Sequence, residues 1–110
     1  MAVLSIEIFL RAPETTDPAS HPTPEWLTRT LAEAITPLTA PGSVMPVIGA
    51  TVDAFPDGDG AQIRATCLAA DGVEAMDTLA ARLEAALFDV ACVEGWHLHA
   101  GQTNWYCADN

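Results

Sequence analysis

Two histidines near the carboxyl end of the sequence, His97 and His99, have the residue types and spacing that most suggest chemistry. Side chains two positions apart on a strand point the same way, so both imidazoles could bind one metal ion. A third ligand would have to come from His21, Cys92, Cys107 or an acidic side chain. None of these stands at a spacing typical of a metal site. We therefore favour an interpretation without a metal, in which Trp96 and Leu98 face the core and both histidines lie on the exposed sheet face.

The motifs that identify common enzymes are missing from the sequence. It contains no G-x-S-x-G elbow, no Walker-type phosphate loop and no G-x-G-x-x-G turn. The run 57–60, DGDG, starts like a calcium loop but lacks the later ligand positions, so we interpret it as a tight turn. Cys107 could pair with His97 or His99 for nucleophilic catalysis, but no local signature supports that pair. We predict no catalytic residue and no cofactor.

The charge balance excludes several classes of partner. The 110 residues carry 15 acidic side chains against four arginines and no lysine, a formal net charge of −11. Binding to nucleic acid or to an anionic membrane needs clustered cations, so we expect neither. The sequence has neither a basic leader nor an apolar run long enough to span a membrane. Three scattered cysteines in apolar contexts indicate buried thiols in a reducing compartment. We expect a cytoplasmic or virion-associated protein that is not secreted.

Hydrophobic patterning predicts a strand, a loop and a helix in the first half of the chain. Residues 3–10, VLSIEIFL, alternate as in a strand, and apolar groups on both of its faces favour a central place in a sheet. Residues 12–23 form a Pro-rich loop. Thr23 then caps a helix that begins at Pro24 and ends near Thr36.

The second half repeats the order of strand and helix. Residues 44–55 indicate a strand that Pro46 places at a sheet edge, and a tight turn leads into a strand over 61–69. Asp71 begins a second helix that ends near residues 88–89. Residues 91–99 suggest another strand, and a turn at 100–102 could lead into a short last strand over 103–107.

The order β, α, β, β, α, β over one domain, residues 1–110, predicts an α+β fold of the ferredoxin-like kind. Right-handed crossovers place both helices on one face of an antiparallel sheet and leave the other face open. Apolar and polar side chains together on that face would suit a protein interface. The interface candidates, including two aromatic residues near the carboxyl end, are Phe9, Arg64, Leu68, His97, His99, Trp105 and Tyr106.

One segment resembles a known family. The run AVLSIEIFLRAP, followed after a polar loop by PEWLTRTLAEAITPLTA, is similar to the strand-to-helix unit of lambda-type phage tail-terminator and minor tail proteins. The resemblance covers about residues 2–40. It implies a non-enzymatic virion subunit that forms a ring on the tail tube, and it assigns no role to individual residues.

Three functions are consistent with these patterns. The first is an assembly subunit that forms a homo-oligomer, with a phage tail or neck protein as its sharpest version. The second is an acidic inhibitor that binds a basic protein partner, which requires acids gathered on one face. The third is a dimeric ferredoxin-like enzyme or small-molecule binder, which requires an apolar cavity on the open sheet face.

Overall fold

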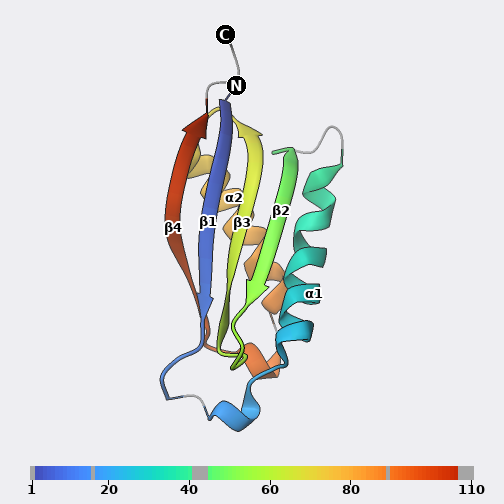
Figure 1. The fold of residues 1–110 in the computed structure, drawn as a ribbon, viewed down its shortest axis with the longest axis vertical. Coiled ribbons are helices and arrows are strands. Elements are labelled where there is room, and N and C mark those ends of the chain that lie inside the picture. Colours follow the sequence, from blue (N-terminus) through green and yellow to red (C-terminus); the bar gives the residue numbers. More distant parts are fainter. Residues whose placement is uncertain (1, 16, 41–44, 89, 107–110) are drawn as a thin grey trace.

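The computed structural model describes residues 2–15, 17–40, 45–88 and 90–106 of the 110-residue chain. It has the predicted α+β class, with a four-stranded antiparallel sheet in the order β2-β3-β1-β4 (Figure 1). Its strands and helices are β1 (Ala2–Arg11), α1 (Pro24–Ile35), β2 (Val47–Ala54), β3 (Gly60–Ala69), α2 (Gly72–Leu87) and β4 (His97–Tyr106). The described residues also include short 3-10 helices at Pro18–Ser20, Thr36–Thr39 and Ala91–Val93.

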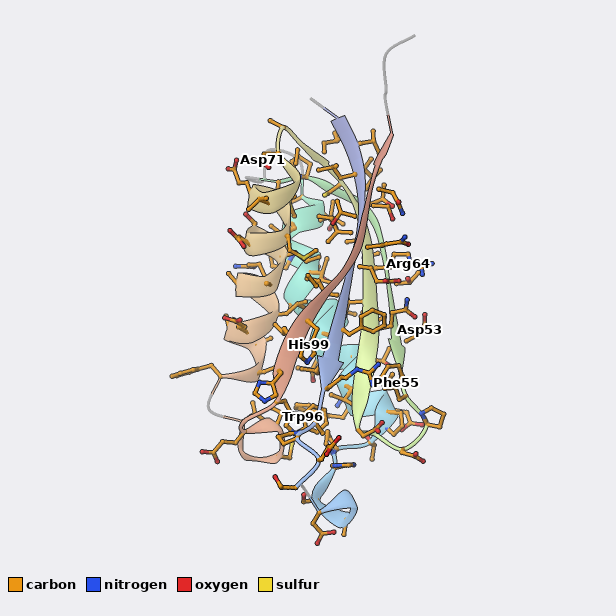
Figure 2. All side chains as sticks on the ribbon, turned by 90° about the vertical axis from the view of Figure 1, so that its left-hand side faces the viewer. Asp53, Phe55, Arg64, Asp71, Trp96 and His99 are labelled. Atoms are coloured by element: carbon orange, nitrogen blue, oxygen red, sulfur yellow. The ribbon has the colours of Figure 1, made fainter. Side chains whose placement is uncertain are left out.

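Strand β1 lies in the middle of the sheet, as its sequence predicts. Its even-numbered residues from position 4 onward are at most 1% exposed: these are Leu4, Ile6, Ile8 and Leu10. Both helices cover the face on which these side chains lie (Figure 2). Since successive side chains of a strand point to opposite faces, this one-sided burial also fixes which residues of β1 face away from the helices.

Each helix begins at a capping side chain. Thr23 Oγ1 accepts a hydrogen bond of 3.1 Å from the backbone N–H of Trp26, and Pro24 occupies the first helical position of α1. Asp71 Oδ1 accepts one of 2.9 Å from the backbone N–H of Val73 at the start of α2. These contacts satisfy backbone N–H groups that have no partner within the helix. Val73 itself is 69% exposed, so it lies outside the buried stripe of α2.

Strands β2 and β3 form the predicted antiparallel hairpin. β2 lies at an edge of the sheet, but it begins at Val47 because Pro46 has no backbone N–H for the ladder. Residues 41–44, which include the expected start of this strand, lie outside the described residues. The turn contains Gly58 with a φ of 69°, and a side chain there would collide with the carbonyl oxygen of Pro22.

The two strands expected over 91–99 and 103–107 are wrong. Residues 91–93 form a 3-10 helix, and a single strand runs from His97 to Tyr106. Gly95 makes the turn between them with a φ of 81°. The interruption expected at 100–102 is a β-bulge within β4, because Ile8 of β1 pairs with Ala100 whereas Ile6 pairs with Thr103.

The buried stripe of α1 leads to a stability prediction. Leu31 is fully buried, so we expect Leu31→Ala to lower the free energy of unfolding by about 3 kcal/mol, through lost burial and the cavity left behind. Glu33→Ala, at an exposed position of the same helix, should change it by less than about 0.5 kcal/mol. Urea denaturation measures both values. Equal effects would contradict the burial of this helix face.

Candidate functional site

The candidate site is one face of the sheet, which we call the open face. No helix of the described residues covers it. It carries Val3, Ser5, Glu7 and Phe9 of β1. Their antiparallel partners on β3 are Leu68, Thr66, Arg64 and Gln62. Figure 2 shows the open face on the side opposite the helices, with Arg64, Asp53 and Phe55 projecting from it.

A carboxylate held by several donors lies at the centre of the open face. Glu7 Oε2 accepts hydrogen bonds from Gln62 Nε2 at 2.6 Å and from Arg64 Nη2 at 3.1 Å. Glu7 Oε1 accepts one from the backbone N–H of Gln102 at 3.3 Å. The bond from Arg64, then those from Gln102 and Gln62, lower the pKa of Glu7 below its usual 4.5. The Glu7 side chain is 18% exposed and that of Arg64 is 58% exposed, so the carboxylate is half-buried while its charged partner reaches the surface.

The bulge in β4 makes this network possible. Gly101 and Gln102 together lie opposite Glu7, and the extra residue lets the backbone N–H of Gln102 reach the carboxylate. A Cβ on Gly101 would lie 2.5 Å from Glu7 Oε1 and 3.0 Å from the Phe9 ring. Glycine at this position therefore gives the Glu7 side chain the room it occupies.

A second cluster, of aromatic and basic side chains, lies toward the hairpin end of the same face. The guanidinium carbon of Arg11 is 5.7 Å from the ring centre of Phe9 and 5.6 Å from that of Phe55. Both are within the range of a cation–π contact. Across β1, His99 pairs with Phe9 and His97 pairs with Arg11, so both histidines share this end of the open face.

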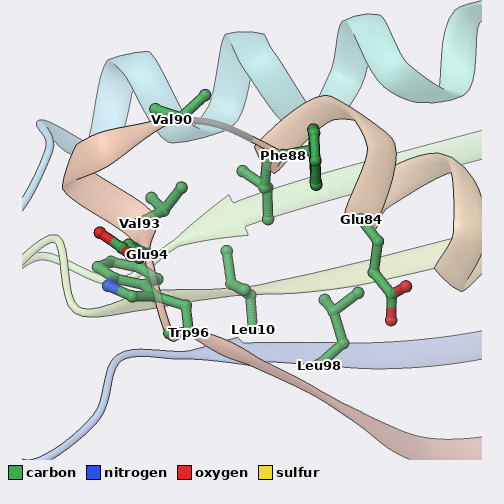
Figure 3. Close-up of a pocket in the computed structure, with 10 residues that line it drawn as sticks. Leu10, Glu84, Phe88, Val90, Val93, Glu94, Trp96 and Leu98 are labelled. Carbon is green, nitrogen blue, oxygen red and sulfur yellow. The ribbon is translucent and has the colours of Figure 1, made fainter.

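The two histidines lie on the exposed sheet face, which is the arrangement that we favour from the sequence. Their ring centres are 6.1 Å apart and both side chains are exposed, whereas Leu98 between them lies on the helix side (Figure 3). His21, considered as a third ligand, instead packs edge-on against Trp96 with ring centres 5.7 Å apart. Within the described residues, no group of three or more His, Cys, Asp or Glu side chains could hold a metal ion. Cys107 lies outside those residues.

The structure brings together most of the predicted interface residues. Phe9, Arg64, Leu68, His97 and His99 all lie on the open face. Trp105 and Tyr106 pair in register with Leu4 and Val3 of β1, and their side chains lie outside the described part of the structure.

Four residues of the open face were not predicted from the sequence. Gln62 and Gln102 carry no recognisable motif, and only the register of the strands shows that they meet Glu7. Arg11 and Phe55 were assigned no role, although their positions at the ends of two predicted strands were a signal that they could lie close together.

A ligand binder that uses the open face would need an apolar cavity there, and the structure does not show one among the described residues. The hollow on the open face measures about 350 Å³ and is lined by polar side chains and Glu7. A larger pocket of about 520 Å³ lies on the helix side, between the end of α2 and the start of β4. The thiol of Cys67 is buried in the core, and that burial raises its pKa, as expected for an inert cysteine.

Comparisons of the chain with models of protein families, with curated proteins and with solved structures found no match. Among the helices of the described residues, none combines the length and apolar character needed to cross a membrane.

The Glu7 network predicts a measurable pH dependence. Because the folded-state pKa of Glu7 is lowered, its ionised form stabilises the fold above the unfolded-state pKa. That contribution is lost as the pH falls through the folded-state value. We expect a carbon-detected NMR titration to place the pKa of Glu7 below 4.5 in the wild type and nearer 4.5 in Arg64→Met. Arg82→Met, on α2, is the matched control, and an equal shift there would contradict the network.

The bulge generates a second prediction. We expect Gly101→Ala to destabilise the protein by about 1–3 kcal/mol, since its Cβ must displace Glu7 or Phe9. It should also raise the pKa of Glu7 by disturbing the bond from Gln102. Gly49→Ala on β2 is the control, because a Cβ there meets nothing within 4 Å. Urea denaturation and NMR titration report the two effects, and unchanged values in Gly101→Ala would show that the bulge tolerates a side chain.

Proposed function

We propose that this chain is a non-enzymatic assembly subunit that binds copies of itself through the open face. The observation that carries the proposal is the composition of that face. It combines the Arg11, Phe9 and Phe55 cluster with a carboxylate already held in place. Aromatic residues and arginine are enriched in protein interfaces, and a polar group fixed before binding costs little ordering entropy on association.

We further infer that the fold is ferredoxin-like. The element order is β1, α1, β2, β3, α2, β4, and each helix connects two parallel strands with one antiparallel strand between them. In this arrangement both helices belong to one face, so association through the other face leaves the core undisturbed.

The sharpest version of this function is a phage tail or neck protein of the tail-terminator kind. It draws support from the resemblance of residues 2–40, in which β1, the Pro-rich loop and α1 follow one another. The net charge of −11 suits a ring through which DNA passes, because an acidic lumen repels the phosphate backbone.

The acidic-inhibitor alternative lacks the clustering that it requires. Exposed acids are divided among α1, α2 and the region of the β2–β3 turn instead of forming a single cluster: Glu25, Glu33, Glu74, Asp77, Glu84, Asp53, Asp57 and Asp59. The ligand-binding alternative is disfavoured by the polar lining of the hollow on the open face.

Light scattering after size-exclusion chromatography tests the proposal with the full chain. We expect the mass to rise with concentration and to reach a defined oligomer. Arg64→Glu should weaken association about tenfold or more, because it adds a like charge beside Glu7 on the open face. Arg82→Glu makes the same charge change on α2 and should leave the mass unchanged.

Two outcomes would overturn the proposal. One is a strict monomer at about 1 mM protein, a concentration at which an interaction of about −4 kcal/mol is half formed. The other is equal weakening by both arginine variants, which would place the interface off the open face. Phe9→Ser, with circular dichroism to check folding, gives an independent test of the aromatic cluster.

A further inference from the structure

A second surface, separate from the open face, has the form of a binding site. The pocket of about 520 Å³ on the helix side lies where α2 ends, the chain turns through the 3-10 helix at 91–93, and β4 begins (Figure 3). Leu10 and Leu98 line it from the sheet, and Val90, Val93 and Trp96 close one side. Trp96 is held in place by the edge-on contact with His21.

Most of the side chains that line this end pocket are apolar, and its charged lining side chains are both acidic. The charged side chains that line it are Glu84 and Glu94, and both are exposed. Phe88 also lines the pocket and is 78% exposed, the largest value among the large hydrophobic side chains described. Covering an exposed phenylalanine beside a hollow lined by leucine, valine and tryptophan side chains would stabilise a complex with a partner.

Charge decides between the occupants that could cover this surface. A second copy of the chain offers no lysine and only four arginines to pair with these carboxylates, and two of them, Arg11 and Arg64, already make contacts on the open face. A basic partner would pair lysine or arginine with Glu84 and Glu94 while an apolar side chain enters the hollow. The volume lies within the range of pockets that enclose small ligands, so it accommodates a large side chain.

We propose that the end pocket binds a segment of a different protein, in which a large apolar side chain is flanked by lysine or arginine. The site does not depend on self-association through the open face, since the pocket lies on the opposite side of the sheet. In an assembly subunit it would provide contact with a second component.

A tripeptide tests this site directly. The probe is acetylated and amidated lysine–phenylalanine–lysine, titrated into the full chain and followed by proton–nitrogen NMR. The indole N–H of Trp96, assigned with Trp96→Phe, reports on the pocket, and the backbone N–H of Glu7 reports on the open face. We expect saturable shifts at Trp96, Val90 and Leu98, with a Kd on the order of 1 mM, and no matching shifts at Glu7.

Matched variants and peptides separate the two parts of the proposal. Glu84→Gln and Glu94→Gln should each weaken binding about two- to fivefold, whereas Glu33→Gln on α1 should not. Lysine–alanine–lysine should bind at least about fivefold more weakly, because it leaves the hollow unfilled. Glutamate–phenylalanine–glutamate should not bind detectably.

Three results would overturn the proposal: no saturable shift at the pocket up to about 10 mM peptide, equal weakening by Glu33→Gln, or equal affinity for the alanine peptide. Because the open-face proposal is tested by the mass of the protein without peptide, either proposal can fail while the other stands.

Discussion

The one-sided burial of β1 is the constraint on which the rest of the structure depends. Four fully buried aliphatic side chains on the even positions of one strand anchor both helices to the same face. The strict alternation of a strand then leaves Val3, Ser5, Glu7 and Phe9 on the other side, in the middle of the sheet. A shift of one residue would bury the Glu7 carboxylate beneath the helices, so the core that stabilises the fold also determines which side chains form the open face.

The bulge in β4 adjusts the last strand to this constraint. Before the bulge, even-numbered residues of β4 such as Leu98 face the helices, and His97 and His99 face away. After the bulge, the odd-numbered Thr103 pairs with the buried Ile6, so odd-numbered residues are on the helix side. One additional residue therefore changes the alternation of β4 halfway along its length. The same residue directs a backbone N–H toward Glu7, so a local irregularity links the register of the edge strand to the centre of the open face.

Much of the fold could be predicted because its signals are local. The alternation of β1, the Thr23 and Asp71 caps and the turn before β3 each lie within a few consecutive residues. The last strand could not be placed, because the apolar 3-10 turn at 91–93 resembles a strand and the bulge breaks the period of two. The candidate site was predicted only in outline: His97 and His99 follow from alternation, whereas the contacts of Glu7 join residues 55, 57 and 95 positions apart.

Both edges of the sheet are irregular, and this limits how such a sheet can grow. β2 is preceded by Pro46 and its pairing shifts at Ile48, while β4 carries the bulge beside Gly101. Bulges bend and twist a strand, so neither edge offers the long, flat row of backbone groups that another strand needs in order to add to it. Such irregular edges disfavour the addition of a strand from another molecule. Irregular edges therefore favour a protein that stays at high local concentration without its sheets joining edge to edge.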